Sequence, residues 1–428
     1  MLSAGEDLEN PHFEMSEFPM SFRRILRACL LGVFVFCVHV AGTGLAKAEQ
    51  SSNESRMTDE LIFPLDDQHN HAPGIAECSN GDLIVSWYRG SGERTADDVA
   101  IYGSRLRKGQ SKQDGTAKWS KPFLWVDTPG FPDCNTCLMI DKEDRLWLFW
   151  PVIIANSWES CLTHYVTSTD YLEDGVPNTS GNGVILLKPD DFQQPAIERW
   201  NEYKKSLPND LTERQQREVE EFQHRLGEKL YQRLGWQPRC KPTALPSGRI
   251  LLPLYSDTYS FSIMAISDDQ GATWFASKPL IGFGNIQPIV LRRNDGTLLA
   301  YMRENGPRGK IRVAESNDDG VTWGNVYDSS LPNPGAGVDG VVLQSGKWLL
   351  VYNDTTDGRN SLAVSLSDDE GRTWKWTRHL EQRESGAYHY PAVIQGKDGT
   401  VHFVYSYFVE GGKSMKHVAA NEAWLMEK

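Results

Sequence analysis

The sequence is short of positive charge. It contains 44 Lys and Arg residues against 57 Asp and Glu residues, which gives a formal net charge of −13 at pH 7. This excess of negative charge argues against nucleic acid or an anionic membrane as a partner. A local group of arginines can still attract an acidic ligand, so net charge alone does not decide what the protein binds.

Cysteine is also scarce, with 7 residues in 428. Cys134 and Cys137 have CxxC spacing, but the sequence has no second pair or histidine cluster to complete a zinc site, and no βαβ context for a redox motif. We therefore expect no metal and no cofactor. Five cysteines lie after residue 48: Cys78, Cys134, Cys137, Cys161 and Cys240. We interpret them as buried thiols, with a disulfide between two of them as the second interpretation.

No apolar run reaches the roughly 20 residues that a membrane-spanning helix needs. The apolar segment 28–41 follows arginines at positions 23, 24 and 27 and precedes Ala46-Lys47-Ala48. This order predicts a signal peptide over residues 20–48 that is cleaved after Ala48 and leaves no stable membrane anchor. We therefore expect an exported protein, periplasmic or extracellular.

The residues before this segment fit no part of a signal. Residues 1–19 are acidic, which favours Met20 as the true start. The Arg23-Arg24 pair permits twin-arginine export, although arginines are common in this region of any signal. The polar residues 49–60 predict a flexible lead-in to the folded domain.

The sequence does have a motif that occurs three times. The pattern S-x-D-x-G-x-T-W stands at Ser267–Trp274, Ser316–Trp323 and Ser367–Trp374, about 50 residues apart. Such a period is typical of stacked or radial units that cannot bury their apolar faces alone. Asp and Gly favour a tight turn, and Ser and Thr hydroxyls bond to local backbone, so we interpret the motif as a hairpin turn without chemistry of its own.

A second pattern occurs six times: a strand, in most copies after a proline, then a turn and an alternating strand. Its turns lie near residues 81, 144, 248, 296, 346 and 399. Four strands in about 50 residues are typical of a propeller blade, so the sequence predicts an all-β, six-bladed β-propeller over residues 61–428. The last unit lacks the S-x-D-x-G-x-T-W motif, which we call a box. The expected strand Leu61–Leu65 is available to complete this last blade and close the ring.

One segment interrupts the strand pattern. Residues 191–236 have helical periodicity, with apolar side chains at positions 219, 222, 226, 230 and 234 after a capping box at Asp210–Glu213. We expect a helical insertion between blades 2 and 3 that lies against the propeller.

In a propeller the innermost strands face the axis, so side chains near the repeated proline and after the second strand converge. Before the proline the chain has His69, His71, Asp133, Arg239, Gln287, Tyr388, His389 and Tyr390. After the second strand it has Arg89, Glu93, Arg94, Asp97, Asp98, Tyr255, Asp257, Arg303, Glu304, Asn353, Asp354, Tyr405 and Tyr407. Clustered charges are costly without a ligand, so these positions predict a binding site.

The residue types at these positions fit two chemistries. Arginines bind a carboxylate bidentately, a Tyr beside a Glu supplies a nucleophile, and an Asp supplies an acid, which together are the requirements for cleaving an acidic glycoside. His71, His389 and a Tyr would instead suit removal of the proton next to a uronate carboxylate, which is lyase chemistry.

The three boxes resemble the Asp-box, or BNR, repeats of sialidases, and the order of blades resembles that superfamily from about Leu61 onward. The resemblance implies a six-bladed propeller, an arginine triad that grips the sialic acid carboxylate, an Asp acid/base, and a Tyr nucleophile assisted by Glu. Sialidases begin their first blade with Arg-Ile-Pro, where this chain has His71-Ala72-Pro73. The first arginine of the triad is therefore missing from its register.

On this resemblance we expect the site residues as follows. The carboxylate is bound by Arg239 and Arg303, with Arg94 or Arg89 as substitute for the third arginine. The acid/base is Asp98 or Asp97, the nucleophile Tyr390 or Tyr407, and its partner Glu304 or Glu93, while His71 is catalytic in the lyase reading.

The sequence therefore predicts a secreted, sialidase-like enzyme that hydrolyses a terminal sialic acid or related acidic sugar from a glycan or oligosaccharide. Asp boxes also occur in propellers that are not sialidases, which leaves two alternatives open. One is a polysaccharide lyase that acts on a uronate-containing glycan, and the other is a propeller that only binds glycan or protein. The pattern is neutral on oligomeric state.

Overall fold

A computed structural model describes residues 54–111, 117–189, 192–205, 207 and 210–427. The expected signal peptide at 20–48, the segment 1–19 and the start of the expected lead-in lie outside the described residues. Within the described ranges, no helix is long and apolar enough to cross a membrane.

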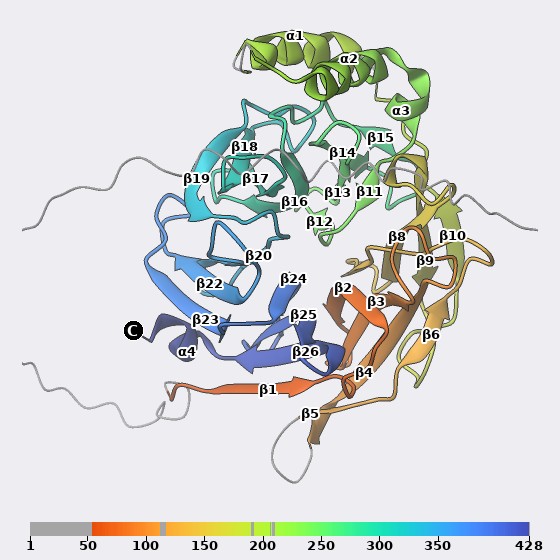
Figure 1. The fold of residues 1–428 in the computed structure, drawn as a ribbon. Coiled ribbons are helices and arrows are strands. Elements are labelled where there is room, and N and C mark those ends of the chain that lie inside the picture. Colours follow the sequence, from red (N-terminus) through yellow and green to blue (C-terminus); the bar gives the residue numbers. More distant parts are fainter. Residues whose placement is uncertain (1–53, 112–116, 190–191, 206, 208–209, 428) are drawn as a thin grey trace, which may run out of the picture. The chain divides into compact units, whose positions relative to one another are not determined.

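Six antiparallel sheets surround a common centre in the unit Ser55–Lys428 (Figure 1). Blade 1 contains β2 (His69–Glu77), β3 (Leu83–Gly90), β4 (Ala100–Ser111), β5 (Ala117–Trp119) and β6 (Phe123–Val126). Blade 2 contains β7 (Cys137–Ile140), β8 (Leu146–Ile153), the short helix η1 (Trp158–Ser160), β9 (Cys161–Ser168) and β10 (Gly181–Val184). Blade 3 contains β11 (Gln237–Pro238), β12 (Thr243–Ala244), β13 (Ile250–Ser256), β14 (Phe261–Ser267) and β15 (Phe275–Ala276).

The remaining blades have four strands each. Blade 4 contains β16 (Asn285–Arg292), β17 (Leu298–Glu304), β18 (Lys310–Ser316) and β19 (Tyr327–Pro332). Blade 5 contains β20 (Asp339–Val342), β21 (Trp348–Tyr352), β22 (Ser361–Ser367) and β23 (Trp376–Gln382). Blade 6 contains β24 (Ala387–Gln395), β25 (Val401–Val409), β26 (Gly412–Ala420) and β1 (Met57–Leu61), and helix α4 (Glu422–Met426) follows β26. The predicted six-bladed propeller is confirmed.

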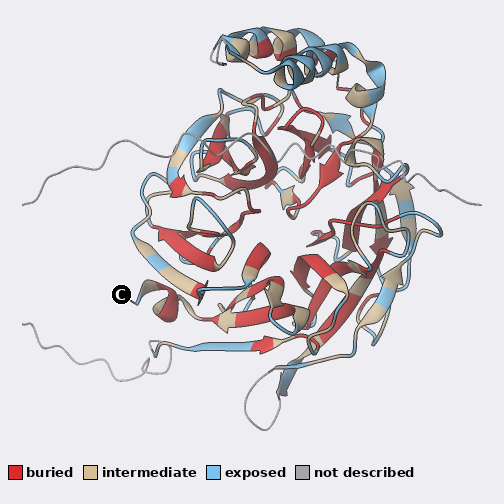
Figure 2. Ribbon diagram, viewed as in Figure 1, coloured by how far each residue is buried: buried red, intermediate tan, exposed pale blue. Residues whose placement is uncertain are grey.

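The middle strands of the blades are buried on both faces. Every residue of β8, β13 and β14 is buried, whereas most residues of the outer strands β19 and β23 are exposed or only partly buried (Figure 2). Each blade therefore covers the apolar faces of its two neighbours, and no blade has a core of its own.

The ring is closed by the first described strand. β1 pairs with β26 from Met57 opposite Ala420 to Leu61 opposite Lys416, so blade 6 is built from distant parts of the chain. The sequence predicts a strand at Leu61–Leu65 and a flexible lead-in up to residue 60, but the strand spans Met57–Leu61 and so includes the end of the expected lead-in. Polar contacts hold this strand in place. Glu60 lies 2.5 Å from His417 Nδ1, and Asp59 lies 2.6 Å from Lys416 Nζ.

The predicted insertion between blades 2 and 3 is helical, with α1 (Gln193–Lys204), α2 (Glu213–Gly227) and α3 (Lys229–Arg233). The capping box lies two residues later than expected, with Thr212 as N-cap and Gln215 as its partner. Trp200 of α1 and Phe222 of α2 pack at 4.3 Å between ring centroids, and both contact Phe283 at the rim of the propeller.

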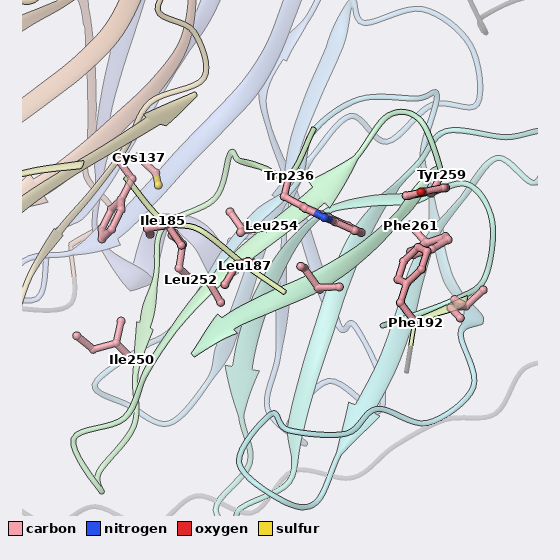
Figure 3. Packing of buried hydrophobic residues seen from close by; sticks show 14 of the residues in the cluster. Cys137, Ile185, Leu187, Phe192, Trp236, Ile250, Leu252, Leu254, Tyr259 and Phe261 are labelled. Carbon is pink, nitrogen blue, oxygen red and sulfur yellow. The ribbon is translucent and has the colours of Figure 1, made fainter. Parts of the chain in front are cut away.

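The insertion shares one apolar cluster with the propeller. Figure 3 shows Phe192 and Trp236, which flank the helices in sequence, beside Tyr259 and Phe261 of blade 3. The rings of Phe192 and Tyr259 lie 4.9 Å apart. The helices are thus anchored by aromatic packing against blades 2 and 3.

The three boxes adopt one geometry. Ser267 Oγ accepts the N–H of Gly271 at 2.7 Å, and Asp269 accepts the N–H of Thr273 at 2.8 Å. The other boxes repeat both bonds, at Ser316, Gly320, Asp318 and Thr322 and at Ser367, Gly371, Asp369 and Thr373. The glycine has a positive φ in each box, +85°, +84° and +83° along the chain.

Each box glycine also touches the preceding blade, which the sequence did not reveal. A Cβ on Gly271 would collide with Trp147 of β8, one on Gly320 with Leu251 of β13, and one on Gly371 with Tyr301 of β17. The box is therefore a joint between blades as well as a turn.

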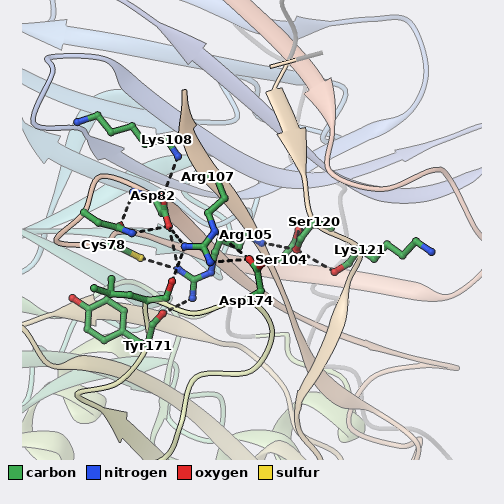
Figure 4. A network of polar contacts seen from close by, with 12 residues as sticks. Cys78, Asp82, Ser104, Arg105, Arg107, Lys108, Ser120, Lys121, Tyr171 and Asp174 are labelled. Atoms are coloured by element: carbon green, nitrogen blue, oxygen red, sulfur yellow. Dashed lines mark hydrogen bonds and ion pairs between the residues drawn. The ribbon is translucent and has the colours of Figure 1, made fainter. Parts of the chain in front are cut away.

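Blades 1 and 2 are joined differently, by the polar network of Figure 4. The guanidinium of Arg105, which is 2% exposed, donates to the carbonyl of Tyr171 in the loop after β9. Arg107 bridges the blades by donating to Asp82 at 2.6 Å and to Asp174 at 2.8 Å. Charged hydrogen bonds thus form the joint where blade 2 has no complete box.

We expect Gly271→Ala to destabilise the protein more than Gly399→Ala. Both glycines have nearly the same φ, +85° and +86°, so alanine costs about 1 kcal/mol at either position. A Cβ meets nothing within 4 Å at Gly399, whereas at Gly271 it meets the Trp147 ring, which adds about 1–3 kcal/mol. Urea unfolding of the two variants measures the difference, and equal losses would contradict the joint.

Candidate active site

The repeated proline marks a bulge that turns a side chain towards the centre. Pairing shifts register between His71 and Gly74 in β2, between Ile286 and Ile289 in β16, and between His389 and Ala392 in β24. The residues before the prolines at these bulges are left-handed, with φ of 51° at Ala72, 54° at Gln287 and 52° at Tyr390. This conformation is strained for non-glycine residues and re-aims the side chain.

Tyr390 of blade 6 lies at the meeting point of several blades. Its hydroxyl accepts a hydrogen bond from Arg303 Nη1 at 2.7 Å and one from Gln287 Nε2 at 3.1 Å, both in blade 4. Gln287 Nε2 also lies 3.1 Å from the hydroxyl of Tyr255 in blade 3. Contacts between blades that are not neighbours require these side chains to meet near the axis.

Three guanidinium groups surround the Tyr390 ring, and we call them the arginine cluster. The guanidinium carbons of Arg239, Arg303 and Arg359 lie 4.9, 5.9 and 5.7 Å from the ring centroid. They come from blades 3, 4 and 5, with Arg359 in the loop between β21 and β22.

The arginine cluster has no carboxylate partner. Within the described part of the chain, none of the three guanidiniums lies within 4.0 Å of a carboxylate oxygen. Burial, and after it the like charge of Arg303, lowers the pKa of Arg359. Arg239 is buried, and Arg303 and Arg359 are partly buried. Positive charges that are withdrawn from water without a counter-charge are costly, so the cluster fits an anionic ligand.

Two histidines also lie beside Tyr390. The His71 ring is 4.2 Å from the Tyr390 ring and 4.7 Å from the His389 ring, measured between centroids. Burial lowers the pKa of both histidines well below the usual value, and neighbouring positive groups add to the effect. Both imidazoles are therefore neutral near pH 7.

Hydrogen bonding assigns the tautomer of His71. Ser406 Oγ is fully buried, accepts the N–H of Ala72 at 3.1 Å and lies 2.8 Å from His71 Nδ1. Among the described residues, His71 Nδ1 is the hydrogen-bond partner to which this hydroxyl can donate its own proton. His71 therefore carries its proton on Nε2 and is a donor there.

Two carboxyl groups lie near this cluster. Glu93 accepts from the Tyr88 hydroxyl at 2.5 Å and pairs with His69 Nε2 at 3.1 Å; burial opposes its ionisation, but these hydrogen bonds outweigh burial and lower its pKa. Burial raises the pKa of Asp257 to about 6, against the opposing charge of Arg303. Asp257 is thus a carboxyl group that can exchange a proton near neutral pH.

The structure brings together four of the predicted site residues, namely Tyr390, His71, Arg239 and Arg303. It places Glu304 elsewhere, because strand alternation turns it away from Arg303. Glu304 forms a buried ion pair with Arg312 at 3.2 Å and accepts the N–H of Gly306. The expected Glu partner of Tyr390 is therefore corrected to the amide of Gln287.

Asp98 and Arg94 also lie outside the cluster around Tyr390. Asp98 is exposed and accepts from Ser91 N and Oγ at 3.0 and 2.7 Å, so it holds its own loop together. Arg94 stacks over Trp158 at 5.5 Å. The alternative residues that the sequence offered for these roles also have local partners. Arg89 pairs with Asp66, Asp97 with Asn156, and Tyr407 packs on Tyr388.

Sequence reasoning missed Arg359. It lies just before the third strand of blade 5, whereas the repeat analysis considered only the proline and the end of the second strand. It is the one basic residue between Tyr352 and Ser361, and that isolated charge was the available signal. Among the described residues, no group of three or more His, Cys, Asp or Glu side chains is placed to hold a metal ion.

Comparison with known proteins finds similarity in the BNR repeats and in the fold. The family model of the BNR repeat-like domain matches residues 232–403. A curated sialidase from Micromonospora viridifaciens is 26% identical over 174 residues, which cover 38% of this chain and 26% of that protein. The chain thus spans about a quarter of the length of this relative.

Solved structures share the fold over most of the chain. A protein of unknown function from Dyadobacter fermentans has a TM-score of 0.62 at 16% identity and covers 86% of this chain and 99% of its own. The intramolecular trans-sialidase from Ruminococcus gnavus has a TM-score of 0.61 at 13% identity, and the match covers 89% of this chain and 100% of that protein. In its three Asp boxes, its matched BNR repeats and its six-bladed propeller, the chain is similar to proteins of the sialidase superfamily.

Proposed function

We propose that the chain is an exported glycosidase that removes a terminal sialic acid, or a related acidic sugar, from a glycan. The observation that carries this proposal is the arginine cluster, since three guanidiniums without a carboxylate partner surround one tyrosine. Relatives named as sialidases support the same class of substrate. Export rests on the signal pattern at 20–48.

The arginine cluster is held in place but keeps free donors. Arg239 Nη2 donates to the carbonyl of Pro391 at 2.7 Å, and Arg359 Nη2 donates to that of Gly335 at 2.8 Å. Within the described chain, the Nη1 atoms of both arginines have no hydrogen-bond partner. Backbone carbonyls thus orient the two guanidinium groups, and their remaining N–H groups are suited to bind a carboxylate.

Tyr390 is the proposed nucleophile. Its hydroxyl oxygen accepts two hydrogen bonds, from Arg303 and Gln287. Such donors would stabilise the negative charge that develops on this oxygen when the hydroxyl loses its proton. Tyr390 Oη would give its proton to solvent water and form a bond to the anomeric carbon, while the bond to the leaving oxygen breaks and that oxygen takes the proton of Asp257. A water molecule, deprotonated by Asp257, would then attack the anomeric carbon and displace Tyr390 Oη, which regains a proton from solvent. Donors rather than a carboxylate base would prepare the tyrosine.

Asp257 is the proposed acid. A pKa of about 6 allows it to hold a proton for the leaving oxygen and to take one from water in the second step. Gln237 Nε2 donates to its carboxylate at 2.8 Å, and Gln237 Oε1 accepts from Asn135 Nδ2 at 3.1 Å. Asn135 in turn contacts Tyr255, which shares Gln287 with Tyr390.

A uronate lyase is the second candidate. His389 favours it, because among the described residues its buried Nδ1 has no hydrogen-bond partner beside Tyr390. His71 does not favour it, since its Nε2 already carries a proton and cannot act as a base. A lyase mechanism would therefore depend on His389 or Tyr390.

Two neighbouring residues give a matched test of carboxylate binding. We expect Arg303→Met to weaken binding of N-acetylneuraminic acid by about 30-fold with little loss of stability. Glu304→Gln should leave this affinity unchanged but lower the free energy of unfolding by about 2 kcal/mol, because Arg312 loses one of its two carboxylate partners and keeps Asp328 at 2.9 Å. Calorimetric titration and urea unfolding measure the two effects, and unchanged affinity in Arg303→Met would remove the proposed site.

The nucleophile is tested with Tyr390→Phe. We expect release of 4-methylumbelliferone from its sialoside to fall about 10³-fold, because the attacking oxygen is gone. The same variant and the wild type are assayed on polyglucuronate for the absorbance of an unsaturated product. Absorbance from the wild type without sialoside cleavage would replace the hydrolase with the lyase.

The acid is tested by the pH dependence of turnover. Only protonated Asp257 can donate, so kcat should fall about tenfold per pH unit above pH 6. In Asp257→Asn this alkaline decline should disappear along with most of the activity. A decline that persists at the same pH in the variant would assign the proton to another group.

A further inference from the structure

We infer that His71 and His389 bind a neutral hydroxyl group of the sugar, opposite the carboxylate held by the arginine cluster. This inference rests on the proposed function and names a specificity device within the same site. It starts from the departure at the first blade, where a histidine stands in place of the arginine of related propellers.

The site has two halves of different chemistry. The arginine cluster comes from blades 3, 4 and 5, whereas His71 lies on β2 of blade 1 and His389 on β24 of blade 6. β2 and β24 run side by side near the centre (Figure 1). The Tyr390 ring is close to both groups, 4.2 Å from the His71 ring and 4.9 Å from the Arg239 guanidinium carbon.

The imidazole half offers unused hydrogen-bonding atoms. His71 presents Nε2–H, because Ser406 occupies Nδ1. In the described part of the chain, neither ring nitrogen of His389 has a hydrogen-bond partner, although the residue is only 4% exposed. Buried polar atoms without partners are costly, so these nitrogens fit a polar group that arrives with the ligand.

The identity of that group follows from donor and acceptor roles. His71 Nε2–H needs an acceptor, and a neutral His389 has one acceptor and one donor nitrogen. A hydroxyl group satisfies both rings at once, because it accepts from one and donates to the other. A carboxylate can only accept, and the arginine cluster offers it charge that two neutral imidazoles lack.

The rings are fixed by their surroundings rather than by the ligand. Phe408 packs against His389 at 4.9 Å and against His71 at 5.8 Å, between ring centroids. His69 lies edge-on to His71 at 5.4 Å and is itself paired with Glu93. A preformed pair of this kind discriminates strongly against a ligand that lacks the hydroxyl.

The test compares two ligands that share a ring and a carboxylate. N-acetylneuraminic acid carries hydroxyl groups, and tetrahydropyran-2-carboxylic acid carries none. We expect the wild type to bind the first about 100-fold more tightly. His71→Phe and His389→Phe should each reduce this ratio about tenfold while binding of the second ligand stays unchanged.

Three controls make the result decisive. His389→Gln keeps a donor and an acceptor and should retain most of the ratio, which guards against a variant that fails to fold. His164→Phe changes a histidine of β9 beside Trp150 and should have no effect. Thermal unfolding is recorded for each variant.

The outcomes separate the two claims. An unchanged ratio in both Phe variants, or an equal loss of both ligands in folded protein, would overturn the hydroxyl assignment and leave the arginine cluster intact. If the wild type binds neither acid, the proposed function fails, and the hydroxyl assignment fails with it.

Discussion

The structure depends on the contact between neighbouring blades. A blade with middle strands buried on both faces cannot be stable alone, so each sheet needs a neighbour on either side and the ring must close. The pairing of β1 with β26 meets that requirement by bringing distant parts of the chain into one sheet. The Asp boxes and the Arg105–Arg107 network are local solutions to the same problem, one steric and the other ionic.

Closure also explains why the centre has unusual chemistry. Each inner strand ends near the axis, and the bulges at Ala72, Gln287 and Tyr390 hold the chain in a strained conformation there. The buried contacts between blades supply the free energy that keeps this strain and three like charges together. The same frame holds the neutral imidazoles of His71 and His389 beside Tyr390.

The sequence was informative wherever a period was present. Box spacing and the repeated turns predicted six blades. The repeated proline brought out Tyr390, His71 and Arg239, and the end of the second strand brought out Arg303. It failed where a side chain's direction depends on one step along a strand, as for Glu304, or on local loop bonds, as for Asp98. Arg359 lies outside the periodic positions, and β1 is held by ion pairs that leave no apolar pattern.

The amide of Gln287 has a consequence for the ancestry of this site. Glutamine and glutamate have nearly the same shape, and their codons differ in a single base. One point mutation therefore separates a tyrosine that receives only hydrogen-bond donors from one that lies beside a carboxylate base. The propeller would need no other rearrangement, so propellers with an amide or a carboxylate beside this tyrosine can be neighbours in evolution while their folds remain the same.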